Sequence, residues 1–302
     1  MKNTLIVLLG PTGVGKTDIS IDIARHFGCD IISADSRQFF REMRIGTALP
    51  SPEQLTEIKH HFIGFLSVKD YYSSNLFERD VLGILPDLFK KNSVVLMTGG
   101  SGMYIDAVCD GIDDIPDVDP EIREKFSRKY KEEGIEGLRI ELKTLDPEHY
   151  EKVDLKNPRR IIRALEICET TGHPYSDFLT NQKRKRDFEI IKTGLKRPRE
   201  ELFDRINRRV DLMIRDGLEE EARNLFGLRH LNALKSVGYR EFFDFFDGKI
   251  TRDKAIELIK RNTRRFAKRQ MTWWSRDDEI RWFGGDDKEE IVDYLTTSIS
   301  GS

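Results

Sequence analysis

Residues 4–17 read TLIVLLGPTGVGKT. The largely apolar run at residues 4–9 (TLIVLL) is typical of a strand that is buried on both faces of a parallel sheet. A glycine-rich turn follows, and a helix is expected from Lys16 to Phe27. Because this turn matches the pattern G-x-x-x-x-G-K-[ST] between a buried strand and a helix, it predicts a loop that binds phosphate groups.

Each residue type in this loop has a physical purpose. Glycines allow backbone N–H groups to converge on phosphate oxygens, and the N-terminus of the following helix adds a favourable dipole. Lys16 would bring positive charge to the terminal phosphates, and the Thr17 hydroxyl would bind Mg²⁺. The predicted ligand is a diphosphate or a longer polyphosphate with Mg²⁺. The predicted phosphate-binding residues are Gly10, Pro11, Thr12, Gly13, Val14, Gly15, Lys16 and Thr17.

Further buried strands are expected at 30–34, 93–97 and 188–195, and long helices at roughly 199–225 and 251–275. Strands that alternate with helices predict an α/β fold of the P-loop NTPase type, a parallel sheet flanked by helices. Ligands of such folds bind at the carboxyl ends of the strands.

The sequence changes in character near Asp113, where a segment rich in proline and aspartate is typical of a linker. From there to about Asp187 the chain is dense in charge and shows only helical patterns. We therefore predict a core in two parts, residues 1–114 and 188–302, interrupted by an all-helical insertion at 115–187.

The composition bounds the class of protein. The chain has 302 residues, 38% of them hydrophobic and 34% charged, which allows a packed core beneath a strongly charged surface. The net charge of −2 does not by itself indicate nucleic acid. Cys29, Cys109 and Cys168 lack the spacing of a metal site or of a disulfide framework. No segment is typical of a signal peptide or of a membrane span of about 18 apolar residues, so we expect a cytoplasmic protein without membrane association.

Asp35 is the acidic residue that we expect to act together with the phosphate-binding loop. ATPases and GTPases place an acid after another buried strand to help hold Mg²⁺, but the strand at 93–97 is followed by Thr98 and two glycines. Asp35 follows the strand at 30–34 instead, which favours a small kinase or a transferase. It could accept a proton from an attacking hydroxyl or amine, and Gln38 could bond to the N6/N7 edge of an adenine. The alternative is a helix cap in a solvated polar turn.

A helix expected after the cap residue Asn157 carries an arginine cluster. Arg159, Arg160 and Arg163 share one broad face, whereas Ile161, Ile162 and Leu165 can face a core. Such a cluster suits phosphates or bases, and the alternative is a solvated face paired with nearby glutamates.

Two further basic stretches follow. Residues 183–186 read KRKR, which is typical of a solvated loop, with a nucleic-acid contact as the alternative. The second stretch, near the C-terminus, contains Lys260, Arg261, Arg264, Arg265, Lys268, Arg269, Arg276 and Arg281. Its apolar spacing predicts one buried face, formed by Ile256, Ile259, Thr263, Phe266, Gln270 and Trp273. The cations of the other face could meet an RNA backbone.

Three arginines, Arg199, Arg205 and Arg209, lie on the helix that follows the strand at 188–195. Arg205 is the candidate favoured to reach back to the phosphate-binding loop, where it would neutralise a departing diphosphate. The alternative for Arg205 is a surface ion pair with Glu201 or Asp204.

Seven motifs occur in order along the chain. They are GPTGVGKT at 10–17, ADSRQ at 34–38, RIGTA at 44–48, GGSGMY at 99–104, NPRR at 157–160, SVGYRE at 236–241 and AKRQMTW at 267–273. Together they resemble the bacterial tRNA dimethylallyltransferases, also called tRNA isopentenyltransferases or IPP transferases. The resemblance runs from end to end. It implies transfer of a dimethylallyl group from dimethylallyl diphosphate to N6 of adenosine 37, next to the anticodon, with release of diphosphate.

The resemblance also implies residue roles. In that family the glycine-rich loop binds the diphosphate of the prenyl donor, although its pattern is also typical of ATP sites. The resemblance implies Asp35 as the base toward the adenine amine, and the other predicted catalytic residues are Thr12 and Arg205. The implied tRNA-binding residues are Asp35, Ser36, Arg37, Gln38, Ser101, Arg123, Arg159, Arg160, Ile161, Ile162 and Arg163. The helical insertion would bind the anticodon stem-loop, Mg²⁺ would be the cofactor, and a monomer is adequate for this work.

The chain departs from the family pattern at several positions. Ser101 stands where threonine is usual, which keeps a hydroxyl group. Leu49 replaces a lysine after the RIGTA motif, so one cationic contact is missing, and Phe39 and Phe40 stand where the family usually has a tyrosine. Two rivals remain open: a small-molecule or nucleoside kinase, which would share the loop and Asp35, and a non-catalytic RNA-binding module, which would leave the loop unexplained.

Overall fold

The computed structural model describes residues 2–113, 115–116, 118–180 and 182–301. The chain divides into two compact units. Unit 1 contains the chain up to Asp110 and from Lys185 onward, and unit 2 runs from Gly111 to Arg184. Both boundaries of unit 2 lie a few residues before those predicted for the insertion.

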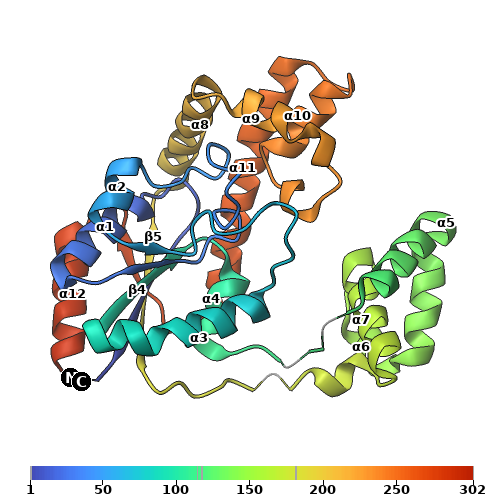
Figure 1. Ribbon diagram of the computed structural model, residues 1–302, viewed down its shortest axis with the longest axis horizontal. Coiled ribbons are helices and arrows are strands. Elements are labelled where there is room, and N and C mark those ends of the chain that lie inside the picture. The colour runs from blue at the N-terminus through green and yellow to red at the C-terminus, as the bar shows by residue number, and fades with distance from the viewer. Residues whose placement is uncertain (1, 114, 117, 181, 302) are drawn as a thin grey trace. The chain divides into compact units, whose positions relative to one another are not determined.

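Unit 1 is built on a six-stranded parallel sheet with the order β3-β2-β4-β1-β5-β6 (Figure 1). The strands are β1 (Thr4–Leu9), β2 (Ile31–Ser33), β3 (His60–His61), β4 (Val94–Gly99), β5 (Glu189–Lys196) and β6 (Arg281–Gly284). This sheet, flanked by helices, confirms the predicted α/β class. The sequence did not predict β3, which is too short to form an apolar run, or β6, which carries an arginine and a tryptophan.

The helices of unit 1 are α1 (Lys16–Phe27), α2 (Pro52–Glu57), α3 (Ser74–Lys91), α4 (Gly102–Asp110), α8 (Arg199–Arg215), α9 (Leu218–Asn224), α10 (Tyr239–Phe246), α11 (Arg252–Trp274) and α12 (Lys288–Ser300). Two short 3-10 helices, Phe226–Leu228 and Asn232–Leu234, lie between α9 and α10. In the part of the chain that the structure describes, no helix is both long and apolar enough to cross a membrane.

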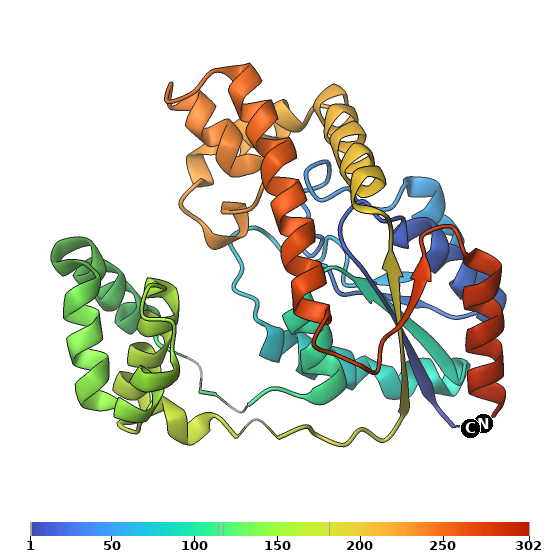
Figure 2. The same cartoon turned by 180° about the vertical axis from the view of Figure 1, so that it is seen from behind.

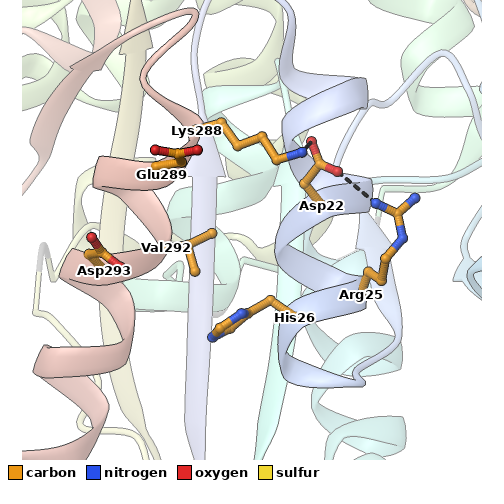
Figure 3. A pocket seen from close by; sticks show the side chains of 7 residues that line it. All are labelled: Asp22, Arg25, His26, Lys288, Glu289, Val292 and Asp293. Atoms are coloured by element: carbon orange, nitrogen blue, oxygen red, sulfur yellow. Dashed lines mark hydrogen bonds and ion pairs between the residues drawn. The ribbon is translucent and has the colours of Figure 1, made fainter.

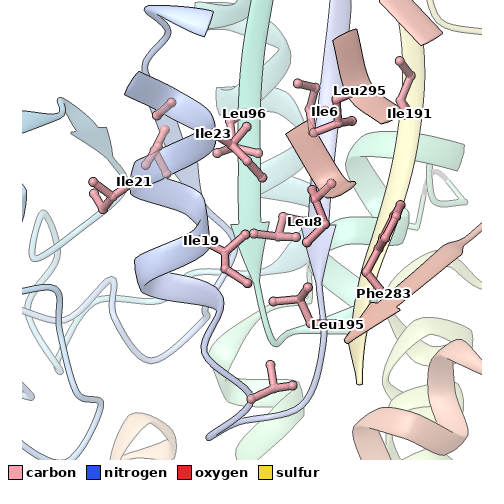
Figure 4. Close-up of a cluster of buried hydrophobic side chains, with 14 of the residues drawn as sticks. Ile6, Leu8, Ile19, Ile21, Ile23, Leu96, Ile191, Leu195, Phe283 and Leu295 are labelled. Atoms are coloured by element: carbon pink, nitrogen blue, oxygen red, sulfur yellow. The ribbon is translucent and has the colours of Figure 1, made fainter. Parts of the chain in front are cut away.

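One face of the sheet packs against α1 and α12. Alternate side chains of β1, Ile6 and Leu8, point to this side together with Leu96 of β4 (Figure 4). They pack with Ile19 and other apolar residues of α1, and Leu295 of α12 belongs to the same cluster. Each of these side chains is at most 5% exposed, so this layer forms a continuous core.

The other face of the sheet packs against α3, α4 and the end of α11. Leu5, Val7 and Leu9 of β1 point to this side, as the two-residue period of a strand requires. Phe77 of α3 and Trp274 of α11 lie in the same buried cluster. Figure 2 shows the sheet from behind, with α3 and α4 on one side and α12 on the other.

A third apolar cluster joins the helices that stand beyond the sheet. Tyr239 and Phe242 of α10 pack with Leu218 of α9, Val210 of α8 and Ile259 of α11. The single helix predicted at 199–225 is in fact α8 followed by α9. The break occurs because the chain turns at Gly217, whose φ of 101° is a left-handed conformation that suits glycine and ends the helix.

The prediction for the buried face of α11 is partly wrong. The fully buried positions are Ala255, Ile259, Ala267, Gln270 and Trp274. Phe266, which was assigned to the core, is 39% exposed. The small side chains of the two alanines allow α11 to lie close to its neighbours, and a pattern search that counts only large apolar residues overlooks them.

Unit 2 contains α5 (Pro120–Leu145), α6 (Pro147–Lys152), α7 (Pro158–Thr171) and a 3-10 turn at Tyr175–Phe178, with no strand among its described residues. The backbone leaves the helical conformation inside α5 at Gly134, where φ is 74°. Its core contains Phe126, Leu138, Leu142, Ile161, Ala164 and Leu165. Unit 2 therefore has a buried cluster of its own.

The backbone that follows β2 packs tightly against the end of β4. Ala34 follows β2, and a Cβ atom added at Gly99 would lie 2.3 Å from the Ala34 carbonyl oxygen. The Ala34 N–H donates to the Thr98 carbonyl oxygen at 2.7 Å, and the Ser101 N–H donates to the Ala34 carbonyl oxygen at 3.2 Å. These two hydrogen bonds fix the backbone of Ala34, so it cannot move away from Gly99.

We expect Gly99→Ala to lower the free energy of unfolding by about 2 kcal/mol or more, because the methyl group overlaps a fixed backbone. The matched control is Gly83→Ala on α3, where a Cβ meets nothing within 4 Å. That change should stabilise the protein by about 0.5–1 kcal/mol, since alanine is the better helix former. Urea unfolding of both variants measures the difference, and equal stabilities would contradict the packing described here.

Candidate active site

The carboxyl ends of four neighbouring strands meet at one edge of the sheet. Leu9, the last residue of β1, pairs with Gly99 of β4 on one side and with Gly194 of β5 on the other. Ser33, the last residue of β2, pairs with Thr98 of β4. The segments that follow β1, β2, β4 and β5 therefore gather at this edge, where ligands of open α/β sheets bind.

Residues 10–17, the phosphate loop, are folded around the side chain of Lys16. Its Nζ donates to the carbonyl oxygens of Gly10 at 2.7 Å and of Pro11 at 3.0 Å. Gly15 caps α1 in a left-handed conformation with a φ of 110°. The ammonium group thus lies against the loop itself, at the N-terminus of a helix, where charge is needed to bind phosphate.

Two arginines of α8 reach the phosphate loop. Arg205 Nε donates to the Gly13 carbonyl oxygen at 2.9 Å. One helical turn further on, Arg209 Nη1 donates to Thr12 Oγ1 at 3.2 Å. The arginine expected to reach back to the loop does so, and Arg209 approaches it from the same helix.

The two other arginines of this region have different surroundings. The guanidinium of Arg199 stacks on Phe203, 5.1 Å from the ring centre. Arg197 Nε donates to the Val14 carbonyl oxygen at 2.8 Å, and its Nη1 pairs with Glu201 at 2.5 Å. Glu201, the suggested surface partner of Arg205, is therefore a partner of Arg197.

Asp35 lies two residues after the end of β2, and its charge acts on two half-buried cations. Its Oδ1 accepts a hydrogen bond from the Arg37 backbone N–H at 3.0 Å. Burial lowers the pKa of both Lys16 and Arg209, and at each of them the charge of Asp35 opposes that effect. One carboxylate therefore faces the ammonium and the guanidinium that adjoin the phosphate loop.

The ammonium of Lys16 is in an unfavourable environment for its charge. Burial is the largest cause and lowers its pKa from 10.5 to about 7, Asp35 acts in the opposite direction, and Arg209 acts in the same direction as burial. Burial therefore favours loss of the Lys16 proton, and an anion bound beside the ammonium favours its retention.

The turn after β4 holds the segment after β2. Ser101 Oγ accepts from the Ser36 N–H at 2.9 Å and bonds to Ser36 Oγ at 3.1 Å. These two predicted tRNA-binding residues are thus partners of each other, and they fix the backbone next to Asp35. The neighbouring Arg37 is half-buried, and burial lowers its pKa.

Gln38 departs from its predicted role. Its Oε1 accepts from Ser33 Oγ at 2.9 Å, and its Nε2 donates to the carbonyl oxygens of Thr47 and Ala48 at 3.3 Å each. Both amide hydrogens are therefore engaged within the protein, and the amide cannot form the predicted pair with an adenine edge in this arrangement. Gln38 instead holds the segment at 47–48 against the end of β2.

Within unit 2, the predicted RNA-contacting arginines have two kinds of environment. Arg159 and Arg160 are exposed in the first turn of α7. Arg163 and Arg123 both pair with Glu166, with N–O distances of 3.7 and 3.6 Å. Burial raises the pKa of Glu166, and the two arginines oppose this effect. These two arginines thus stabilise a buried carboxylate, whereas the first two are open to a ligand.

The prediction that Ile161 contacts tRNA is wrong for its side chain. Ile161 is 0% exposed and lies in the core of unit 2 with Ala164 and Leu165. Ile162 is partly buried and packs against the same core. The reason is helical spacing, because residues three and four apart share the face that α7 turns to α5.

The prediction of a solvated loop at 183–186 is wrong for its last residue. The side chain of Arg186 is 9% exposed, and its Nη2 pairs with Glu78 of α3 at 2.7 Å. Its guanidinium also donates to the carbonyl oxygens of Ala107 and Val108 in α4. Because α4 ends there, its last carbonyls need donors from outside the helix, and Arg186 supplies them.

The basic stretch on α11 is only partly available to a ligand. Lys260 pairs with Asp211 at 2.6 Å, Arg264 donates to Asn207 at 2.5 Å, and Arg276 pairs with Asp106 at 3.0 Å. Arg265, Lys268 and Arg269 are exposed, next to the exposed ring of Phe266. An RNA backbone could reach this narrower group of cations.

The donor atoms around the phosphate loop suit a metal that arrives with phosphates. In the residues that the structure describes, no group of three or more His, Cys, Asp and Glu side chains could hold a metal ion alone. Thr17 offers a hydroxyl group in the first turn of α1. Mg²⁺ held by substrate phosphates needs only one or two protein oxygens, so Thr17 fits that arrangement.

A surface pocket of about 350 Å³ lies apart from this edge of the sheet, between α1 and α12 (Figure 3). Its lining has mixed charge. Asp22 pairs with both Arg25 and Lys288, at 2.7 and 2.8 Å. Because these charges neutralise one another, the pocket lacks the concentrated positive charge that a phosphate ligand requires.

A model of the IPP transferase family matches residues 38–277. The chain belongs to the IPP transferase family. Membership confirms the resemblance that the seven motifs predict.

Close relatives and a solved structure agree with this assignment. The chain is 55% identical over 296 residues to tRNA dimethylallyltransferase 1 of Bacteroides fragilis, with 98% of each chain covered. It is 54% identical to tRNA dimethylallyltransferase 2 of Parabacteroides distasonis, covering 98% of this chain and 99% of that one. Its structure is similar to the crystal structure of the tRNA isopentenylpyrophosphate transferase of Bacillus halodurans, with a TM-score of 0.71 and 33% identity over 99% of this chain and 96% of that chain.

For this member of the IPP transferase family, sequence reasoning favours Arg205 over Arg209 and gives Gln270 no functional role. The position of Arg209 one turn after Arg205 on the same face of α8 is the signal that both reach the loop. Gln270 was assigned only to a buried face. A polar residue at a fully buried position of a helix needs partners, and that requirement was the signal for its contacts.

The shifted pKa of Lys16 predicts that the affinity for inorganic diphosphate falls as pH rises above about 7. A bound anion raises the pKa of Lys16 again, so binding at pH 8 should take up about one proton at this residue. Calorimetry in buffers of different ionisation enthalpy measures that uptake. Lys16→Met is the control, because the titration of diphosphate itself is common to both proteins. Equal proton uptake by the two proteins would contradict the assignment.

Proposed function

We propose that the protein is a tRNA dimethylallyltransferase. It would transfer a dimethylallyl group from dimethylallyl diphosphate to N6 of adenosine 37 of tRNA, next to the anticodon, and release diphosphate. The observation that carries the proposal is the position of one carboxylate, Asp35, beside the cations of a phosphate loop. The names of the close relatives support the same reaction.

The phosphate loop would hold the leaving group. Lys16 and the backbone N–H groups at the start of α1 would bind the diphosphate, and Arg205 and Arg209 would neutralise the charge that develops as it departs. Mg²⁺ bound by Thr17 and the phosphates would supply further positive charge to the same group. An allylic carbon tolerates positive charge, so the bond to oxygen can weaken before the bond to nitrogen forms.

Asp35 would serve the acceptor. The N6 amine attacks the allylic carbon, the carbon–oxygen bond to diphosphate breaks, and the nitrogen loses one proton. Asp35 would orient the amine and accept that proton, as a general base. Thr12, whose hydroxyl contacts Arg209, would be a further catalytic residue, supplied by the phosphate loop.

The tRNA would be bound by both units. Ser36, Arg37 and Ser101 adjoin Asp35, and the exposed Arg159 and Arg160 of unit 2 would contact the anticodon stem-loop. The target base must leave its stack to reach Asp35, which costs a few kcal/mol at most in a single-stranded loop. One chain carries all these groups, so a monomer is adequate for the reaction. We also propose that the protein is cytoplasmic.

A kinase is the rival for the same loop. It would need Mg²⁺ ligands suited to phosphoryl transfer, but β4 ends in Thr98 and Gly99, without an acid. It would also leave the exposed arginines of unit 2 without a purpose. Incubation of the protein with labelled dimethylallyl diphosphate and unmodified tRNA separates the two: label in the tRNA supports the transferase, and ATP turnover without label would overturn it.

We expect Asp35→Asn to lower the transfer rate by a factor of about 10² or more, because the amide cannot accept the proton. Binding of tRNA should persist, since the amide keeps the shape of the side chain. Asp87→Asn, a change of an exposed aspartate on α3, is the matched control and should leave the rate unchanged. Single-turnover rates with saturating substrates measure the effect, and an unchanged rate in Asp35→Asn would remove the base role.

Arg209→Met and Arg199→Met form a second pair on one helix. Loss of Arg209 should lower the transfer rate by a factor of about 10²–10³, as expected for a group that stabilises developing charge. Loss of Arg199, which stacks on Phe203, should change it by less than about threefold. Comparable losses in the two variants would argue against a specific role for Arg209.

A further inference from the structure

Gln270 lies on α11 and bonds to two loops that are far apart in the sequence. Its Oε1 accepts a hydrogen bond from the Thr12 backbone N–H at 2.9 Å. Its Nε2 donates to the Gly100 carbonyl oxygen at 2.7 Å. The residue is only 6% exposed, so both bonds are shielded from water and neither can be replaced by solvent without cost.

The two loops carry different parts of the proposed reaction. Thr12 belongs to the phosphate loop, whereas Gly100 begins the turn that fixes Ser36 through Ser101. A Cβ atom added at Gly100 would lie 2.4 Å from Gln270 Nε2 and 4.0 Å from Asp35 Oδ2. The amide of Gln270 is therefore a direct neighbour of the segment that bears the proposed base.

The bond from Thr12 fixes one peptide group of the phosphate loop. Here the Thr12 N–H donates to Gln270, while the Thr12 hydroxyl contacts Arg209. The amide of Gln270 thus sets the orientation of this peptide group.

We propose that Gln270 is a positioning residue that sets the distance between the phosphate loop and Asp35. Through this distance it would also set the separation between the allylic carbon and the attacking nitrogen. This inference rests on the proposed function. Reaction between two bound substrates depends steeply on such a distance, and a displacement of about 1 Å can lower a rate by a factor of about 10². A side chain that bonds to both loops at once is suited to fix it.

The amide group is the only side chain of this length that satisfies both loops. A glutamate would keep an acceptor for the Thr12 N–H but would bring a negative charge against the Gly100 carbonyl oxygen. A methionine has a similar length and no donor. Helix α11 keeps its place in either variant, because Ala267 and Trp274 are buried in the two cores of the sheet.

The test compares Gln270→Met and Gln270→Glu with the natural protein. The single-turnover transfer rate at saturating dimethylallyl diphosphate and tRNA should fall by a factor of about 10² in both. The dissociation constants of inorganic diphosphate and of tRNA should change by less than about threefold, because each loop keeps its own binding groups. Trp273→Phe removes the other polar contact of α11 near this turn, from Nε1 to Asp106 at 2.9 Å, and should leave the rate near that of the natural protein.

Each result separates the alternatives. Natural rates in both Gln270 variants would overturn the inference, as would a loss that appears only as weaker diphosphate binding, which would mean that Gln270 merely stabilises the phosphate loop. A Trp273→Phe variant as slow as the Gln270 variants would also overturn it, since any contact of α11 would then have the same effect. Absence of transfer by the natural protein would refute the proposed function itself. Thermal unfolding of each variant verifies that it is folded.

Discussion

The register of the parallel sheet is the constraint on which the candidate site depends. Leu9 lies opposite Gly99, and Ser33 lies opposite Thr98, so three strands end within one residue of one another. The missing side chain of Gly99 allows the backbone of Ala34 to approach within contact. A shift of one residue between any two of these strands would separate the phosphate loop from Asp35 and turn the buried side chains to the opposite face.

Positively charged side chains gather around the phosphate loop. Arg209, Arg205 and Arg197 contact three successive residues of the phosphate loop, at positions 12, 13 and 14. Carbonyl oxygens accept two of these bonds, and Arg197 also pairs with Glu201 and Asp286. The charge of Asp35 acts on both Lys16 and Arg209, and burial lowers the pKa of both cations. A bound anion would stabilise these cations, because it would add negative charge beside them.

Sequence pattern predicts what depends on neighbours along the chain. The strand that precedes the phosphate loop and the helix that follows it appear with their predicted bounds, because apolar runs and caps act locally. Contacts between distant segments do not leave such a pattern. The partners of Gln38 and Arg186 come from loops and helix ends that only the fold brings near. The face of α11 was misjudged because small residues such as Ala267 carry as much packing information as large ones.

The anchoring of Arg186 on α4 has a consequence for how this protein could have evolved. The chain leaves unit 1 at Asp110, the last residue of α4, and on its return Arg186 binds the carbonyl oxygens of Ala107 and Val108 on that same helix. The chain therefore leaves unit 1 from α4 and is bound to the same helix when it returns, and no strand of the sheet is interrupted. A stretch of chain bounded in this way can be lengthened, shortened or exchanged as a cassette without a change in strand order. Descendants of one catalytic scaffold could thus acquire different RNA-binding appendages at that position.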